Sequence, residues 1–208
     1  MLTKHSSKRP RILIGKDTRK SGDMLEAALT AGLCSMGAKV IPLGVVPTPA
    51  VAYLTRYYKA DAGVVISASH NPCEYNGIKF FNSDGYKLSD GIENEIESYI
   101  LGEKAIEELP THGKVGYVSA NHNAVEDYVA FAVSTIDCRL DGMKIAVDCA
   151  NGASYETAFK ALNKLGANVE AIHNTPDGVN INHMCGSTHM ESLQAYVCLL
   201  YTSDAADE

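Results

Sequence analysis

The feature that most constrains this chain is the regular alternation of short apolar runs and longer segments of helical periodicity over its first 66 residues. Apolar runs at 11–14, 39–43 and 62–66 have the length and composition of buried strands. The segments between them, 21–37 and 48–58, have the periodicity and end signals of helices. An order of strand, helix, strand, helix, strand predicts a parallel sheet with helices on both faces.

The first predicted helix has clear signals at both ends. Its apolar residues recur at helical spacing, as in an amphipathic helix: Met24, Ala27, Ala28, Ala31, and Cys34 or Ser35. Ser21 or Asp23 is the candidate N-cap, and Gly37 is the stop. The second helix begins at Thr48, with a proline directly after this candidate cap.

The pattern changes after the third strand. Residues 78–81 read as a strand, 82–85 as a hairpin turn and 89–108 as a polar, acidic helix, of which 93–108 is expected to be a solvated face. The first domain is therefore expected to span residues 1–110.

The alternation restarts after a linker region. Residues 111–142 are rich in glycine and polar residues at first and then predict a bridging helix at 124–136. Strand, helix and strand patterns follow at 144–147, 154–165 and 168–172, which predicts a partial second domain over 143–197. Residues 198–208 look like a non-native tail. The expected fold class is α/β: a mixed, largely parallel sheet covered by helices, followed by an incomplete second α/β domain of the same kind.

Charge and cysteine content exclude several protein classes. The 18 basic and 25 acidic residues give a net charge of −7, with the acidic excess spread along the chain, which argues against a nucleic-acid partner. The six cysteines form no Cys-x-x-Cys pair, and the first residues contain no apolar signal core, so we expect a reduced, cytoplasmic protein. Apolar runs stay well below the roughly 20 residues that cross a bilayer, so no membrane partner is expected. The oligomeric state cannot be read from the sequence.

The richest stretch for chemistry is the polar segment 67–77, directly after a buried strand. Open α/β sheets bind ligands at the carboxyl ends of their strands. Ser69 could act there as a nucleophile, with His70 and Lys79 as candidate helpers. The alternative is a simple turn made by serine, asparagine and proline, with His70 hydrogen-bonded to it. A serine hydrolase is disfavoured because the Gly-x-Ser-x-Gly elbow is absent.

The same segment carries a resemblance to a known family. Residues 66–72 (Ile-Ser-Ala-Ser-His-Asn-Pro), followed by 76–81 and 84–88, resemble the active-serine segment of the α-D-phosphohexomutase superfamily. The amino-acid sequences of these motifs are most similar to those of the bacterial phosphoglucosamine mutase branch. Four further stretches agree with family motifs: 15–22, 44–49, 176–182 and 185–189. The resemblance covers about residues 8 to 197.

The resemblance implies an isomerase that moves a phosphoryl group between O6 and O1 of a hexosamine phosphate. A phosphorylated serine is donor and acceptor, and the matching position is Ser69, not Ser67. It also implies a Mg²⁺ ion on the phosphate of Ser69, since a hard cation neutralises charge on the transferring group. Phosphoglucomutase or phosphomannomutase specificity, or a non-catalytic α/β binding module that retains the loop, remain alternatives.

Four further residues receive candidate roles from this match. Lys79 aligns with a lysine that approaches the transferring phosphoryl group; otherwise it is a strand residue with a solvated head. His70 and Asn71 would hold the phosphate or orient the substrate, or else only build the turn. Arg19 is a candidate contact for a substrate anion, or an ordinary solvated arginine.

Two other features invite interpretation and are discounted. His183, Cys185 and His189 suggest zinc, but they offer only three ligands. Asn151-Gly152 could bind phosphate through its backbone, but an ordinary strand-to-helix turn explains it.

The chain also departs from the family pattern. The family's opening segment, its Asp-Gly-Asp-x-Asp-Arg metal loop and its later domains have no counterpart here. We therefore expect these 208 residues to be inactive on their own.

Overall fold

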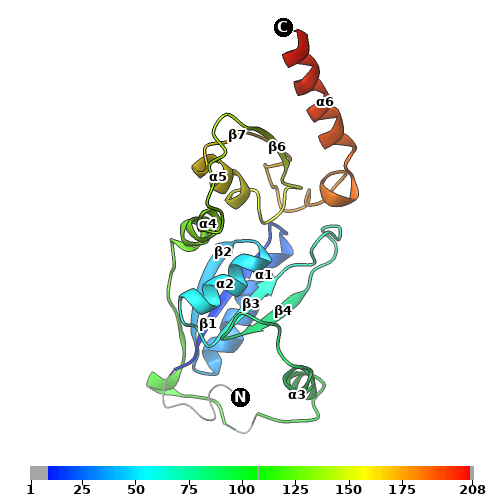
Figure 1. Ribbon diagram of the computed structural model, residues 1–208. Helices are drawn as coiled ribbons and strands as arrows, with labels where there is room; N and C mark the ends of the chain where they lie inside the picture. Colours follow the sequence, from blue (N-terminus) through cyan, green and yellow to red (C-terminus); the bar gives the residue numbers. More distant parts are fainter. Residues whose placement is uncertain (1–8, 107, 207–208) are drawn as a thin grey trace.

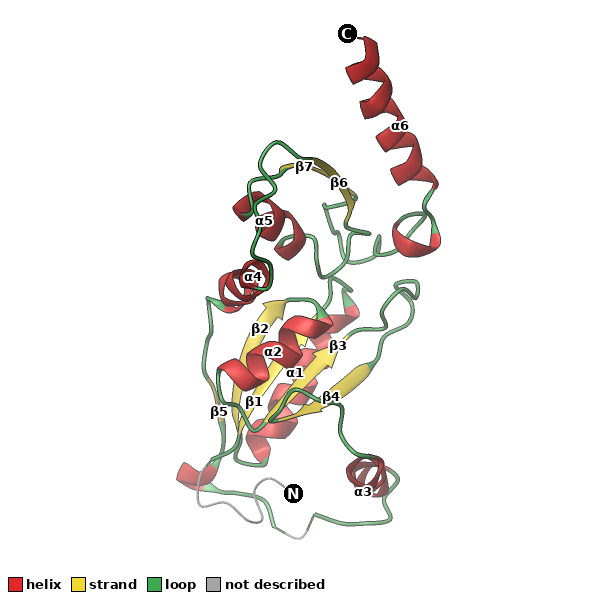
Figure 2. Ribbon diagram, viewed as in Figure 1, coloured by secondary structure: helices red, strands yellow, loops and turns green. Residues whose placement is uncertain are grey.

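The computed structural model describes residues 9–106 and 108–206 (Figure 1). The larger sheet has five strands in the order β4-β3-β1-β2-β5 (Figure 2). Their bounds are β1 Arg11–Lys16, β2 Lys39–Val45, β3 Ala62–Ile66, β4 Ile78–Asn82 and β5 Tyr117–Val118. All neighbours pair in parallel except β3 and β4, which are antiparallel. The predicted mixed, largely parallel sheet is confirmed.

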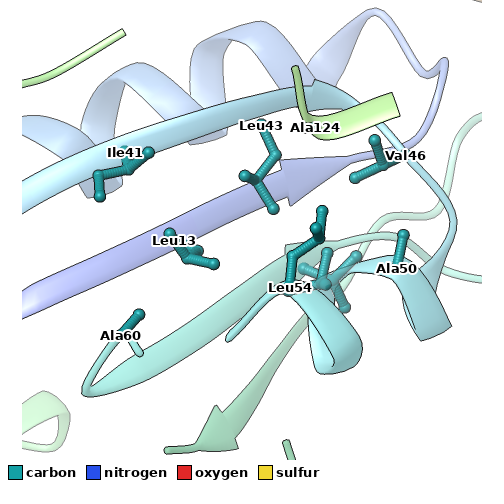
Figure 3. Close-up of a cluster of buried hydrophobic side chains, with 10 residues drawn as sticks. Leu13, Ile41, Leu43, Val46, Ala50, Leu54, Ala60 and Ala124 are labelled. Atoms are coloured by element: carbon teal, nitrogen blue, oxygen red, sulfur yellow. The ribbon is translucent and has the colours of Figure 1, made fainter. Parts of the chain in front are cut away.

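Two helices cover the two faces of this sheet. Because side chains alternate along a strand, Leu13 of β1 packs under α2 (Thr48–Tyr57), in a cluster that includes Ile41, Leu43 and Leu54 (Figure 3). The neighbouring residues of the same strands form a second cluster on the other face, beneath α1 (Ser21–Ser35). The two buried layers fix the positions of β1 and β3, the strands that lead to the candidate site.

The buried face of α1 differs from the face suggested by the sequence pattern. Leu25, Leu29 and Leu33 contact the sheet, whereas Met24 is 67% exposed. The leucines are spaced four residues apart, so they also form one stripe, and they bury more apolar surface than the alanine-rich stripe. Ser21 is not the N-cap either: Lys20 holds that position, and no side chain caps the helix.

The acidic helix is shorter than expected. It forms α3 (Asp90–Ile100) and has no buried residue, in agreement with a solvated helix. It ends soon before Gly102, whose φ of 76° lies in the left-handed region. A 3₁₀ turn, η1 (His112–Lys114), and β5 follow, so the expected linker contributes an edge strand to the first sheet.

A second, smaller unit is built around two parallel strands, β6 (Lys144–Asp148) and β7 (Asn168–Ile172), with α5 (Thr157–Lys164) between them in sequence. The chain continues through η2 (Gly186–Thr188) into α6 (Glu191–Ala206), which passes residue 198 without a break. None of the helices in the described part of the chain has the length and apolar character required to cross a bilayer.

The helix α4 (Ala124–Ser134) joins the two units. On one side, Phe131 stacks on Tyr53 of α2, with ring centroids 3.7 Å apart. On the other side, Glu126 accepts hydrogen bonds from Lys160 and Lys164 of α5. These contacts hold the second unit beyond the carboxyl ends of β1 and β3 (Figure 1).

Candidate active site

Two loops meet at the carboxyl end of the first sheet. Because β1 and β3 are adjacent and parallel, residues 17–20 and 67–77 leave the sheet at the same edge. The backbone N–H of Asp17 donates to the carbonyl of Ile66 across 3.0 Å, which continues the pairing one step beyond the strands. The first loop therefore lies directly beside the start of the segment that contains Ser69.

The two serines of this segment have different environments. Ser67 is buried, its N–H donates to the carbonyl of Gly77, and its Oγ accepts a hydrogen bond from the N–H of Ser69 at 3.1 Å. Ser69 is exposed and has a φ of 56°. The Ser67 hydroxyl thus supports the turn, while the Ser69 hydroxyl is available at the surface.

The left-handed backbone of Ser69 is uncommon for a residue with a Cβ. Such conformations cost on the order of 1–3 kcal/mol and persist only where surrounding contacts hold them. Those contacts are directed at the carbonyls of Ser69 and Asn71. Both carbonyls accept hydrogen bonds from two side chains, one from each structural unit.

The first of these side chains is Arg19. It is only 2% exposed and is paired with the buried carboxylate of Asp17. Its Nη2 donates to the carbonyls of Ser69 at 3.3 Å and Asn71 at 2.5 Å. Arg19 is therefore not the solvated arginine that the sequence left as one alternative: its described contacts hold the serine segment. Its contact with a substrate anion stays a prediction.

The second side chain is Asn182, from the loop after β7. Its Nδ2 donates to the same carbonyls, at 2.9 Å for Ser69 and 3.0 Å for Asn71. Two further bonds join this unit to the first loop. Thr18 Oγ1 donates to the carbonyl of Asn151 at 2.5 Å, and the N–H of Lys20 donates to the carbonyl of Gly178 at 2.9 Å.

The remaining predicted site residues lie around Ser69. His70 and Asn71 follow it in the same exposed turn. Lys79 lies on β4 opposite Val65 and is also exposed. At the far end of the loop, Asn76 Nδ2 donates to Ser21 Oγ at 2.9 Å. The fold therefore places Ser69, its two neighbours and Arg19 at one edge, with Lys79 on the adjoining strand.

The discounted zinc residues are not brought together. Instead, ligand atoms of Cys185, Asp148 and His173 lie within 4.8 Å of one another. The Asp148 carboxylate already accepts hydrogen bonds from the backbone of Ala150 and Gly186, and it lies 3.1 Å from His173 Nδ1. Burial raises the pKa of the Cys185 thiol, and the Asp148 charge raises it further. The contacts of Asp148 therefore explain this cluster as a structural one, which holds the loops of Ala150, His173 and Gly186 together.

The Asn151-Gly152 turn is also accounted for within the fold. The N–H of Asn151 donates to the carbonyl of His173, and that of Gly152 donates to the carbonyl of Cys149. These two donors are used by the protein, which favours the strand-to-helix turn over a phosphate site.

Comparison with protein families gives a match for residues 1–107. The matching description is phosphoglucomutase/phosphomannomutase, alpha/beta/alpha domain I. The chain belongs to the phosphoglucomutase/phosphomannomutase family.

Curated relatives refine this family assignment. A phosphoglucosamine mutase of Acetivibrio thermocellus is 60% identical over 197 residues, which are 95% of this chain and 44% of the relative. A phosphoglucosamine mutase of Clostridium acetobutylicum has the same identity and coverage. The chain thus spans less than half the length of these relatives.

Solved structures support the same fold. A putative phosphomannomutase from Thermus thermophilus matches with a TM-score of 0.73 and 25% identity, over 90% of this chain and 43% of that one. A phosphoglucomutase/phosphomannomutase family protein from Burkholderia thailandensis matches with a TM-score of 0.67 and 26% identity, over 84% and 38% of the two chains.

The contribution of Asn182 was missed at the level of sequence. It belongs to the stretch 176–182, which carries part of the family resemblance, but a polar loop residue gives no signal for a partner 113 positions away. The sequence did indicate that this stretch is a tightly turned loop, because it is rich in asparagine, glycine and aspartate.

Proposed function

We propose that this chain carries the phosphoserine part of a phosphosugar mutase active site, and that the whole enzyme interconverts glucosamine 6-phosphate and glucosamine 1-phosphate. The observation that carries the proposal is the contrast between the two serines: Ser69 is exposed in a held left-handed turn, and Ser67 is buried with its hydroxyl engaged. The names of the relatives support the sugar assignment.

The reaction follows from a standing phosphate on Ser69. The phosphoserine transfers its phosphoryl group to O1 of glucosamine 6-phosphate, which leaves a free serine hydroxyl and a glucosamine 1,6-bisphosphate. After the bisphosphate turns around, Ser69 Oγ takes the phosphoryl group from O6, and glucosamine 1-phosphate remains. Each transfer moves one phosphoryl group between two oxygens, and the second transfer restores the starting phosphoserine.

Residues of this chain have separate roles in these transfers. Lys79, on the strand beside the serine segment, supplies positive charge that stabilises the transferring phosphoryl group. His70 and Asn71, exposed in the same turn, bind the phosphate or the sugar. Arg19 holds the backbone of the turn and does so from a buried position.

The proposal includes Mg²⁺, which would neutralise charge on the transferring group when bound. The Ser69 phosphate would supply one oxygen ligand from this chain. Among the side chains that the structure describes, in residues 9–106 and 108–200, the only group of three His, Cys, Asp or Glu close enough to hold a metal is the Asp148 cluster described above. Mg²⁺ favours six oxygen ligands, so the remaining ligands would come from the substrate, from water and from parts of the enzyme outside these residues.

We also propose the division of the chain into a first domain over 1–110, a linker and bridging helix over 111–142, a partial second domain over 143–197 and a tail. A cytoplasmic location accords with the absence of a disulfide at Cys34, Cys73, Cys138, Cys149 and Cys185.

The test uses a chimeric enzyme, in which this sequence replaces the matching region of the Acetivibrio thermocellus relative. The enzyme is incubated with Mg²⁺ and labelled glucose 1,6-bisphosphate, and the phosphopeptide is mapped. We expect the label on Ser69, its loss in Ser69→Ala and its retention in Ser67→Ala. Label on Ser67, or no label on the active enzyme, would overturn the assignment.

The same enzyme tests the choice of sugar. Turnover is compared for glucosamine 6-phosphate, glucose 6-phosphate and mannose 6-phosphate, and we expect the highest kcat/KM for the amino sugar. A higher value for either neutral sugar would replace the glucosamine assignment with phosphoglucomutase or phosphomannomutase specificity. An enzyme that binds these sugars without turnover would favour a binding module.

A further inference from the structure

The contacts of Asn182 point to a role that goes beyond joining two parts of the chain. Its side-chain amide has two N–H donors, and they point to two carbonyls in the serine segment, those of Ser69 and Asn71. Arg19 donates to the same two carbonyls. A carbonyl oxygen has two lone pairs, so each of these carbonyls is fully engaged by one donor from each unit.

These hydrogen bonds act at the residue whose backbone most needs support. Ser69 has a φ of 56°, and its orientation determines where its Oγ points. With Arg19 alone, the turn would be held on one side by a long side chain that also serves Asp17. Asn182 approaches from the second unit and holds the other side of the turn through its two hydrogen bonds.

The loop that carries Asn182 is itself held in place. The N–H of Asn182 donates to the carbonyl of Ala150 at 2.9 Å, and the residue has a φ of 57°. Asparagine tolerates this left-handed conformation better than most residues. The short amide therefore extends from a fixed backbone, which makes it suited to fix a partner's geometry.

We propose that Asn182 is a positioning residue for phosphoryl transfer: its amide, bonded to the Ser69 and Asn71 carbonyls, holds Ser69 Oγ in line with the transferring group. The chemical part of this inference rests on the proposed function. The inference also makes the serine segment dependent on the second unit, because the contact spans the joint between them.

The substitution that isolates the amide is Asn182→Gly, since glycine keeps the left-handed backbone and removes only the side chain. Asn182→Asp is a second variant, since it keeps the size and the tolerance for this backbone but loses the N–H donors. Met184→Gly is the matched control. Met184 lies in the same loop, has a φ of 51° and is 65% exposed.

The first measurement is hydrogen exchange of the 208-residue chain, read from peptides that cover 67–77. The amide of Asn71, bonded to the carbonyl of Ala68, reports the closed turn. We expect exchange in this segment to speed up about tenfold in both Asn182 variants and to stay unchanged in Met184→Gly. Unchanged exchange in the Asn182 variants would overturn the inference.

The second measurement is steady-state kinetics of the chimeric enzyme. We expect kcat to fall between about 10-fold and 100-fold in Asn182→Gly and Asn182→Asp, with KM for glucosamine 6-phosphate changed less than about threefold, since misplacement of a reacting atom slows the transfer step. A rise in KM at constant kcat would overturn the positioning role, as would an equal loss in Met184→Gly.

The two measurements separate this inference from the proposed function. Hydrogen exchange requires no activity, so it tests whether Asn182 holds the serine segment even if the chimeric enzyme proves not to be a mutase. Absence of phosphoserine in the unsubstituted chimera would overturn the proposed function. In that case the exchange result alone would decide whether Asn182 holds the turn.

Discussion

The buried ion pair of Asp17 and Arg19 gives the sharpest test of how the candidate site is built. Both side chains are almost fully buried, at 3% exposed for Asp17 and 0% for Arg19. Asp17→Asn keeps the shape of the side chain but removes the negative charge and turns an N–H₂ toward the guanidinium. Removing one partner of a buried ion pair leaves the other charge uncompensated and costs about 3–5 kcal/mol of stability.

A loss of this size is large against the total stability of a domain, about 5–15 kcal/mol. With a urea dependence of about 2 kcal/mol per molar, the unfolding midpoint should fall by roughly 1.5–2.5 M. The assay is urea unfolding of the 208-residue chain followed by circular dichroism. The serine segment should also become more susceptible to proteolysis, because Arg19 holds two of its carbonyls.

The matched control is Asp141→Asn. Asp141 also pairs with an arginine two residues away, but both side chains of that pair are more than 60% exposed. Exposed ion pairs contribute little, so the urea midpoint should not change measurably. If Asp17→Asn shifted the midpoint no more than this control, the argument that a buried charge needs its partner would be refuted for this site.

Four other predictions concern the chemical step, the packing of the sheet, the stability of helix α1 and the response to pH. Lys79→Met in the chimeric enzyme should lower kcat roughly 100-fold with a much smaller rise in KM; an unchanged kcat would make Lys79 a scaffold residue. Gly63→Ala should destabilise the chain by about 1–3 kcal/mol, measured as a lower Tm, because the added Cβ would clash with Thr55 Oγ1. Gly32→Ala meets no atom within 4 Å and should instead stabilise helix α1 by about 1 kcal/mol, so a loss of stability there would contradict the packing. Burial and the hydrogen bond that Tyr58 donates to the Asp127 carboxylate of α4 raise the pKa of Tyr58 from 10.0 to about 12. The unfolded chain therefore loses this proton first, so stability should fall between pH 10 and 12, and Tyr58→Phe should show less of that fall in urea unfolding at each pH.

Much of the fold follows from local patterns that the sequence displays directly. Strands β1, β2 and β3 are short apolar runs of the kind typical of a buried parallel sheet, and the segments between them have the length of crossover helices. The turn at 82–85 is fixed by its own residues, since Asn82 accepts hydrogen bonds from the backbone of the turn. The exposed serine segment after β3 could be placed for the same reason, because parallel strands end at one edge of the sheet.

Other features were decided by packing between segments distant in sequence. Two stripes of α1 have helical spacing, and only contact with the sheet selects Leu25, Leu29 and Leu33 over the stripe that includes Met24. The edge strand β5 is two residues long, too short to produce a periodic signal, and it exists because β2 offers it backbone partners.

The candidate site likewise combines features that local sequence predicts with features that depend on long-range contacts. The contiguous motif in the sequence was enough to predict Ser69 and its neighbours as the reactive segment. The burial of Ser67, the inward direction of Arg19 and the contact of Asn182 with the carbonyls of the serine segment depend on the folded arrangement of the two units. The physical reason is that a polar loop residue is compatible with solvent or with many partners, and its hydrogen bonds are selected only when the folded backbone brings one acceptor within reach.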